Sequence, residues 1–504
     1  MFKKLFILFF VTHIATFISP VFSQKHGTGL NFDVPSYRGT PYKATLTASS
    51  YASMPTSASV EQYAPTPGDQ GQYSTCVAFA CAYHARTIMT AKLLGLTNKS
   101  EINKLIYSPT WIYEQIKDSK DLNCKNGTSP IDALELMKNK GCSSISKQPY
   151  QCGSKIADDA KIEASDYKLD DFQILFLPDV EDVDVRVRST KKALAEGMPV
   201  VLCFIVAESF YKAGVLWEPL ATDDGPTGQH GRHAMCVVGY DDNKYGGAFR
   251  VLNSWGIKWG DGGFVWIKYA DYAKYAMGAL QPFPSKISVK PLPVPEPDPT
   301  ITPQPKPTPV VSNILSGEVE FRKNTGEMME ANKISTRNLV IEDEKQIKPY
   351  GEDLVAYRMN NNYASGTKFR FFINTNSEAY VYAFATDLTG IVNKILPFQD
   401  GMSPHIGANS QIAFPSETKI VKMDENKGTD YMLILFSSEK LDANAMLEKM
   451  NAVKGGLSSK IAAALGNKLL LPSKVQYKTN SIGFDASGNS EGKVVPLMVE
   501  ITHI

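Results

Sequence analysis

The stretch GDQGQYSTCVAFACAYHA, Gly68–Ala85, places a cysteine where a loop rich in glycine and glutamine turns into an alanine-rich run. A lone cysteine among alanines is usually a small apolar residue of a buried helix. The alternative is a reactive thiolate, because the positive end of a helix dipole lowers a thiol pKa. Ser74 and Thr75 are residue types that cap helices, so we expect a helix from Ser74 to about Leu94 with Cys76 in its first turn.

A nucleophilic thiol needs a base, and the histidines differ in how well their surroundings suit that role. His233 opens the strand-like run HAMCVVGY, where the fold can fix its ring, whereas His230 lies in the glycine-rich loop GPTGQHG. His84 shares the helix of Cys76 but lies about 12 Å further along the axis, beyond hydrogen-bond reach. We therefore expect His233 to be the base.

The run NSWGIKWGDGGF begins at Asn253, twenty residues after His233. A buried asparagine side chain can accept a hydrogen bond from an imidazole nitrogen and so set its tautomer. Trp255 and Trp259 can cover that bond and exclude water. A lone Asn-Ser-Trp-Gly is usually only a turn, but together with the other two runs it indicates a catalytic site.

The length, the net charge and the first residues of the chain limit the classes of protein to which it can belong. The chain has 504 residues, room for two or three domains, and its net charge of +1 argues against a nucleic-acid partner. Lys3 and Lys4 precede an apolar run and a small-residue site, which predicts a signal peptide over residues 1–23. A membrane anchor is the alternative, although the run is shorter than about 20 residues. We expect a secreted protein, extracellular or periplasmic, with no integral membrane segment after cleavage.

The proline-rich stretch KPLPVPEPDPTITPQPKPTP, residues 290–309, divides the chain. Alternating prolines form neither helix nor ladder, so we expect an extended linker over 287–310 that keeps the two halves apart and independent. Helices followed by strands in the front half, 54–286, predict an α+β unit with two lobes. Strands with one helix, about Ala443–Leu465, predict a β-sandwich over 311–504. Residues 24–53 form an N-terminal extension.

The front half resembles the papain family of cysteine peptidases over about Met54–Lys286. Three runs carry the resemblance in the family's order, namely DQGQYSTCVAFA, HAMCVVGY and NSWGIKWGDGGF. The resemblance implies a papain-like fold, with a helical lobe and a β-barrel-like lobe. It also implies Cys76 as nucleophile, His233 as acid and base, and Asn253 as the residue that orients the imidazole. Gln70, with the backbone N–H of Cys76, would form the oxyanion hole.

The chain departs from the family pattern at several positions. Val77 stands where a tryptophan is usual, and Tyr73 stands where a disulfide cysteine is common. The glycine-rich substrate strand is reduced to NCKNGTS, which leaves Gly127 as the expected backbone contact for an extended peptide. Arg232 precedes the histidine where a small or acidic residue is common, and we place it with Trp255 at substrate-binding positions.

Two further expectations concern the cysteines and the extension. We expect a disulfide between Cys124 and Cys152, with Cys142 as an alternative partner for either. The extension 24–53 is too short to be the family's usual long inhibitory propeptide.

The sequence therefore predicts a secreted endopeptidase that hydrolyses protein or peptide substrates through a thioester acyl-enzyme, without metal or cofactor. A catalytically silent papain-like scaffold for binding or adhesion is one alternative. An exopeptidase is another, because the extension before Met54 could block part of the cleft. The back half resembles an uncharacterised β-rich accessory domain of bacterial secreted or signalling proteins. We expect it to dock to a cell envelope or to a protein.

Overall fold

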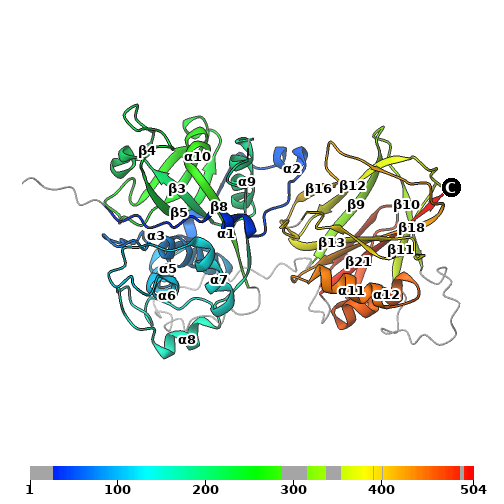
Figure 1. Cartoon of the computed structure of the whole chain (residues 1–504), viewed down its shortest axis with the longest axis horizontal. Helices are drawn as coiled ribbons and strands as arrows, with labels where there is room; N and C mark the ends of the chain where they lie inside the picture. Colours follow the sequence, from blue (N-terminus) through cyan, green and yellow to red (C-terminus); the bar gives the residue numbers. More distant parts are fainter. Residues whose placement is uncertain are drawn as a thin grey trace, which may run out of the picture.

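The computed structural model describes residues 26–180, 182–285, 315–335, 354–389, 391–399, 401–487 and 493–504. The signal peptide predicted for 1–23 and the linker predicted for 287–310 lie outside the described residues. None of the helices in these ranges is both long enough and apolar enough to cross a membrane. Figure 1 shows two bodies side by side, one with a helical lobe and a strand lobe, the other built mainly from strands.

The helical lobe is built around one buried helical run from Cys76 to Leu93. It begins as α3 (Cys76–Ala78), is π-helical over Phe79–Arg86, and ends as α4 (Thr87–Leu93). Its alanines are fully buried, as the nearly continuous apolar pattern predicts. The remaining helices of the lobe are α5 (Lys99–Lys104), α6 (Pro109–Ile116), α7 (Pro130–Lys140) and α8 (Asp158–Ala164).

The strand lobe is an eight-stranded sheet in the order β2-β8-β3-β5-β6-β7-β4, and β1 pairs with β5. Every pairing is antiparallel except that of β4 with β7. Two helices accompany the sheet, α9 (Asp184–Ala195) and α10 (Tyr269–Tyr275). The strands are β1 (Ser57–Ser59), β2 (Leu169–Ile174), β3 (Val200–Val206), β4 (Leu216–Trp217), β5 (Gly231–Asp241), β6 (Ala248–Leu252), β7 (Phe264–Lys268) and β8 (Ala276–Pro284). The predicted two-lobed α+β architecture is thus confirmed.

The second body is a β-sandwich, as predicted. One sheet has the order β10-β11-β21-β18-β13-β14 with β15 on β13, and the other β16-β12-β9-β20-β19 with β17 on β12. Residues of both sheets share one apolar core. The strands are β9 (Leu315–Lys323), β10 (Ala331–Ser335), β11 (Val355–Met359), β12 (Lys368–Thr375), β13 (Ala379–Thr386), β14 (Asn393–Leu396), β15 (His405–Ile406), β16 (Ser410–Phe414), β17 (Val421–Lys422), β18 (Gly428–Ser437), β19 (Val475–Tyr477), β20 (Ile482–Ala486) and β21 (Val494–His503).

The single helix predicted near Ala443–Leu465 is wrong in one respect. The structure has two helices, α11 (Ala443–Ala452) and α12 (Leu457–Leu465). Gly455 and Gly456 lie between them, and Gly455 adopts a positive φ of 117°, which ends a helix without steric cost. The two helices cover the outer face of the larger sheet through a second apolar core.

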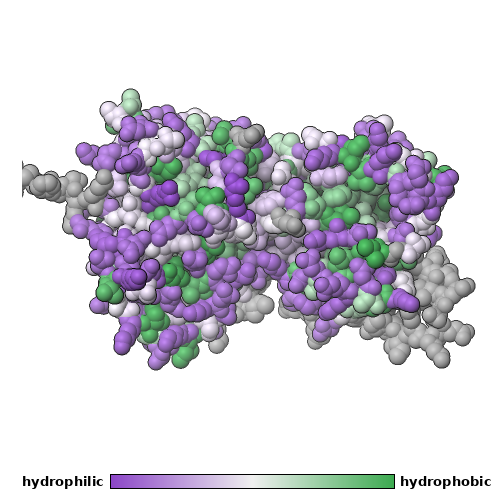
Figure 2. Space-filling model, in the orientation of Figure 1, coloured by the Kyte–Doolittle hydropathy of each residue, from purple (hydrophilic) through white to green (hydrophobic). Residues whose placement is uncertain are grey.

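The expectation that the two halves are held apart is also wrong. The Lys192 ammonium donates to the carbonyl oxygens of Ala408 and Asn409, at 3.1 and 3.0 Å. The rings of Phe283 and His405 lie 3.8 Å apart. The space-filling view shows the two bodies touching along part of their facing sides (Figure 2). An extended linker sets only the greatest separation of two domains, and complementary surfaces can still bring them together.

Candidate active site

His233 and Asn253 come together on neighbouring strands of the lobe. His233 lies in β5, and Asn253 follows the end of β6, its partner strand. The ring Nε2 of His233 lies 2.7 Å from Asn253 Oδ1. The backbone N–H of Ser254 donates to the same oxygen at 2.8 Å, so that atom is an acceptor and Nε2 carries the proton. The tautomer this fixes leaves Nδ1 with a lone pair, and Nδ1 has no hydrogen-bond partner among the described residues.

Cys76 lies at the contact between the two lobes, since α3 packs against β5. The backbone of Ala234, the residue after His233, lies close enough to the Cys76 thiol to lower its pKa. The backbone of Gly29, in the N-terminal extension, acts on the thiol in the same direction. The structure thus brings the predicted nucleophile, base and orienting asparagine into one buried group.

The expected side-chain cap and lowered thiol pKa are wrong for this state of the molecule. Thr75 occupies the cap position but makes no side-chain bond to the helix, because its hydroxyl lies 2.7 Å from the Tyr150 hydroxyl. Burial raises the pKa of the Cys76 thiol to about 11, and backbone N–H groups oppose that effect only in part. Burial also lowers the pKa of His233 to about 4. The pair is therefore a neutral thiol beside a neutral imidazole.

Gln70 is held by three partners, each of which uses a different part of its amide. Its Oε1 accepts from the Ser254 hydroxyl at 2.6 Å. Its Nε2 donates to the carbonyl oxygens of Tyr73, at 2.7 Å, and Gly27, at 3.0 Å. The donor expected to face an oxyanion thus faces a backbone carbonyl of the extension. Ser254 was not singled out from the sequence, although it follows Asn253 directly in the NSWG run.

Residues 26–31 of the extension, called the blocking segment below, lie across this site. In Figure 1 the first described residues, in dark blue, run between the helical and strand lobes. The Gly27 N–H donates to Gly71 O at 3.2 Å. Thr28 O accepts from the Ser74 hydroxyl at 3.0 Å. The segment therefore covers the side of Cys76 that a substrate would approach.

Two of the predicted substrate-binding positions contact this segment. A Cβ added at Gly127 would lie 2.2 Å from Gly29 O, so only glycine allows this approach. The pairing bonds themselves come from the next residue, Thr128, which donates to Gly29 O and accepts from the Asn31 N–H, both at 3.0 Å. Arg232 takes part through its carbonyl, which accepts from the Leu30 N–H at 3.1 Å.

The third predicted position, Trp255, is part of an aromatic cluster beside the catalytic group. Its ring lies 4.7 Å from that of His233, which covers the bond to Asn253 as predicted. The ring of His26 stacks on it at 5.1 Å with an interplanar angle of 9°. Tyr211 stacks at the same distance with an angle of 5°. The blocking segment thus begins with a ring seated against the indole.

The direction of the blocking segment does not present a peptide bond for attack. Leu30 pairs with Thr128 in parallel register. The backbone beside the Cys76 thiol belongs to Gly29, whose carbonyl accepts from the Thr128 N–H, whereas the carbonyl at Gln70 belongs to Gly27, two residues earlier. A thiolate attacks a carbonyl carbon whose oxygen points at the oxyanion donors. The segment therefore occupies the site without offering a reactive carbonyl there.

Hydrogen bonds to the Tyr113 hydroxyl and a disulfide hold the loop that carries Gly127. The Tyr113 hydroxyl donates to Asp121 Oδ2 at 2.6 Å and accepts from the Gly127 N–H at 3.1 Å. The expected disulfide between Cys124 and Cys152 is confirmed, so the alternative through Cys142 is not used.

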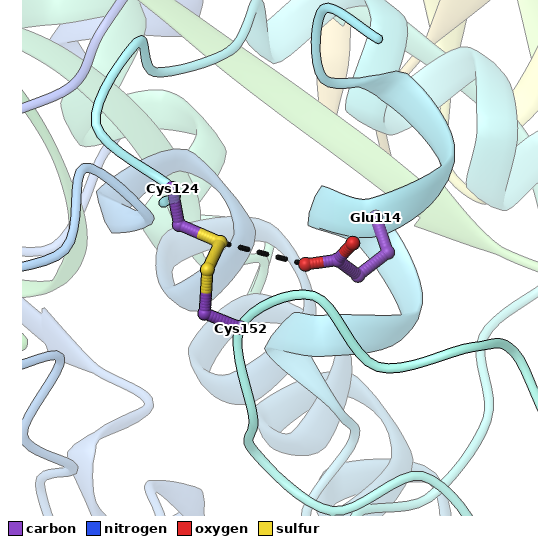
Figure 3. Close-up of side chains that lie close together, drawn as sticks. All are labelled: Glu114, Cys124 and Cys152. Carbon is purple, nitrogen blue, oxygen red and sulfur yellow. Dashed lines mark hydrogen bonds between the residues drawn. A yellow bond between two sulfur atoms is a disulfide. The ribbon is translucent and has the colours of Figure 1, made fainter. Parts of the chain in front are cut away.

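Figure 3 shows Glu114 beside this disulfide. Among the described residues, Glu114, Cys124 and Cys152 are the one group whose potential ligand atoms lie as close together as a metal site requires. Both sulfurs are consumed in the disulfide, and the Glu114 carboxylate accepts from the Gly153 N–H and pairs with Lys117. These three residues therefore stabilise the loop.

The two rejected histidines lie apart from the Asn253 bond. His84 is fully buried in the π-helical stretch, and neither of its ring nitrogens has a partner among the described residues. Burial lowers the pKa of His84 to about 3. His230 bonds through Nε2 to Gly225 O at 2.6 Å, within its own loop.

Two parts of the chain match known domain families. Residues 57–282 match the papain family of cysteine proteases, and residues 362–440 match a domain of unknown function, DUF4384. An uncharacterized peptidase C1-like protein of Acanthamoeba polyphaga mimivirus is 37% identical over 92 residues, 17% of this chain and 28% of the relative. A KDEL-tailed cysteine endopeptidase of Arabidopsis thaliana is 25% identical over 203 residues, 40% of this chain and 50% of the relative.

Among solved structures, xylellain, a cysteine protease from Xylella fastidiosa, is similar with a TM-score of 0.43 and 23% identity. That match covers 52% of this chain and 97% of the other. The chain thus spans about half the length, or less, of the two curated relatives above. Residues 57–282 form a cysteine peptidase domain of the papain family.

Proposed function

We propose that the protein is an exported cysteine endopeptidase, made in a latent form in which residues 26–31 cover Cys76. One observation carries the proposal. The Asn253 amide fixes the proton on His233 Nε2 and leaves Nδ1 unbonded, in a strand that contacts the helix start bearing Cys76. A binding scaffold has no use for a tautomer set in this way.

In the proposed reaction, His233 Nδ1 takes the proton of the Cys76 thiol once the blocking segment has left. The thiolate attacks the carbonyl carbon of the substrate, and the Gln70 amide and the Cys76 N–H donate to the oxyanion. The imidazolium then gives its proton to the leaving amine, and a thioester remains on Cys76. Water, deprotonated by the same imidazole, attacks the thioester carbonyl, the thiol leaves with a proton, and the carboxylic acid is released.

Removal of the blocking segment changes the electrostatics in the direction that this chemistry requires. Burial is the largest cause of the raised Cys76 pKa and of the lowered His233 pKa. Water entering the site relieves both effects, and the nearby imidazolium and helix N-terminus then favour the thiolate.

The test uses the full chain carrying Gly29→Ala, which displaces the blocking segment because the added Cβ would lie 2.2 Å from Ser74 O. We expect a thiol-directed epoxide to label Cys76, and a quenched peptide blocked at both ends to be hydrolysed. In this background His233→Ala should lower kcat/KM by about 10³-fold or more, whereas the matched His230→Ala should leave it within about twofold. Asn253→Ala should have an intermediate effect, since it frees the ring without removing the base.

Labelling without hydrolysis would contradict the endopeptidase and favour the scaffold. Hydrolysis only of peptides with a free terminus would favour the exopeptidase.

The same proposal includes export by a signal peptide over residues 1–23, two domains joined by a linker over 287–310, and docking by residues 311–504. Cleavage after Ser23 leaves Gln24 as the first residue, two residues before the blocking segment. Mass spectrometry of the mature protein should therefore find Gln24 at its N-terminus. A mature chain that begins after residue 53 would mean that the isolated form has already lost its blocking segment. Docking to an envelope or a large protein through residues 311–504 is measured by binding to cell-surface fractions.

A further inference from the structure

The extension does not end at the active site. Residues 42–51, called the anchoring segment below, lie against the second body. The Tyr42 N–H donates to Gly401 O at 2.7 Å, and its carbonyl accepts from the Ser403 N–H at 2.8 Å. Further on, the Thr47 N–H donates to Gln411 O at 2.9 Å. Figure 1 shows α2 (Ala48–Ala52), which begins within this segment, on the side of the first body that faces the sandwich.

Side chains of the anchoring segment are part of the second body's own core. Ala44 and Leu46 are 2% and 4% exposed, and they belong to the apolar cluster of the sandwich and not to any of the three clusters of the peptidase domain. The first N–H of α2, from Ala48, donates to Glu417 Oε2 at 2.9 Å. The Ser50 hydroxyl accepts from the Gln411 N–H at 2.7 Å. The segment is therefore docked by backbone, apolar and polar contacts together.

A short and well-fixed piece of chain joins the two segments. It holds α1 (Val34–Gly39), where the Tyr37 hydroxyl donates to carbonyl oxygens of the strand lobe and accepts from the Ala279 N–H at 2.9 Å. Within the anchoring segment, Lys43 faces back to the peptidase domain: it pairs with Glu196 at 2.9 Å, with both side chains buried, and its N–H donates to Ile174 O at 2.8 Å. These contacts fix the short stretch of chain between the sandwich surface and the site at Cys76.

The sandwich is in turn tied to the peptidase domain beside this seat. The Asp171 carboxylate of β2 accepts from Lys440 at 2.7 Å, and its neighbour Asp170 accepts from the Tyr380 hydroxyl at 2.8 Å. These contacts do not involve the extension. They can therefore be removed separately from the anchoring segment.

We propose that the face of the β-sandwich formed around Gly401–Ser403, Gln411 and Glu417 is a docking surface for residues 42–51, and that this docking keeps the blocking segment on Cys76. The second body then controls latency, and whatever lifts residues 42–51 from the sandwich opens the site. This inference rests on the proposed function, because it assigns the C-terminal domain a role in regulating the same catalytic group.

The test measures hydrogen exchange in the full chain, which reports local opening without requiring activity. Leu46→Asp places a charge in the apolar core and should release the anchoring segment. We expect exchange to rise in residues 42–51 and, by about tenfold, at the Leu30 and Asn31 amides. Leu46→Ala is the milder second variant, in case Leu46→Asp does not fold. Tyr380→Phe is the matched control, which loosens the direct contact between the bodies and should leave exchange at Leu30 and Asn31 unchanged.

Faster exchange at 42–51 with unchanged exchange at Leu30 and Asn31 overturns the inference, because the two segments would then be independent. An equal effect of Tyr380→Phe overturns the specific role of the anchoring segment. If the exchange result is as expected but the Leu46 variants hydrolyse no peptide, the inference about docking stands and the proposed peptidase activity fails.

Discussion

The blocking and anchoring segments belong to one extension, but they bind to different domains. The blocking segment binds the peptidase domain through its backbone and through Leu30, which is 4% exposed in that domain's core. Its two glycines fit because a Cβ at either would lie 2.2 Å from a carbonyl oxygen. The anchoring segment is held by side chains that enter another domain's core. Single hydrogen bonds contribute only about 0.5–1.5 kcal/mol net, whereas burying a leucine contributes about 1.5–3 kcal/mol. Each segment therefore combines backbone bonds with a buried leucine, and the two glycines set the blocking segment apart.

The largest expected effect concerns pH, because the blocking segment buries the thiol. With a Cys76 pKa of about 11, the thiolate fraction rises about tenfold for each pH unit below that value. Alkylation of Cys76 in the latent full chain should therefore rise about a hundredfold between about pH 7 and pH 9. Mass-spectrometric mapping against iodoacetamide measures the rate at each pH. A profile that is flat over this range would show that the thiolate already exists beneath the segment.

The next effect comes from the glycines of the extension. Gly29→Ala should raise both peptide hydrolysis and Cys76 labelling at pH 7 about tenfold or more, since overpacking costs about 1–3 kcal/mol. It should also flatten the pH profile, because water then reaches the thiol. Gly39→Ala is the matched control, since a Cβ at Gly39 meets nothing within 4 Å. Equal rates for the two variants would mean that the segment does not limit access to the site.

The proposed catalytic group could be named from the sequence because each member lies in a run with its own local signal. His233 lies near the start of β5, and Asn253 directly follows the end of β6, so their meeting follows from the pairing of these two strands. The fold followed for the same reason, since buried helices and alternating strands leave periodic patterns. The helix break at Gly455–Gly456 was also visible in the sequence, as two adjacent glycines, and the single-helix prediction read through it.

The role of the extension could not be read in this way. Backbone pairing of Gly29 with Thr128 leaves no side-chain pattern, and the burial of Leu46 depends on a core more than 250 residues away in the chain. The missing cap at Cys76 has a similar cause. The hydroxyls of Ser74 and Thr75 are the right type for a cap, but tertiary partners engage both. Local propensity gives way when distant groups compete for the same atoms.

The smallest expected effect separates backbone from side-chain contributions within the blocking segment. The Ser74 hydroxyl lies 3.0 Å from Thr28 O and 2.8 Å from Lys125 O, and like the Gln70 amide it joins the entry loop of the helical lobe to the blocking segment. Ser74→Ala removes about 0.5–1.5 kcal/mol, so exchange at the Leu30 and Asn31 amides should rise about threefold. Ser165→Ala, whose hydroxyl bonds only to Ile162 O in the same lobe, is the matched control. If both variants exchange alike, the Ser74 hydroxyl does not hold the blocking segment, and its other hydrogen bonds together with Leu30 do. If exchange also rises in residues 42–51, the two segments open as one unit, and the seat on the sandwich is then no stronger than the seat on Cys76.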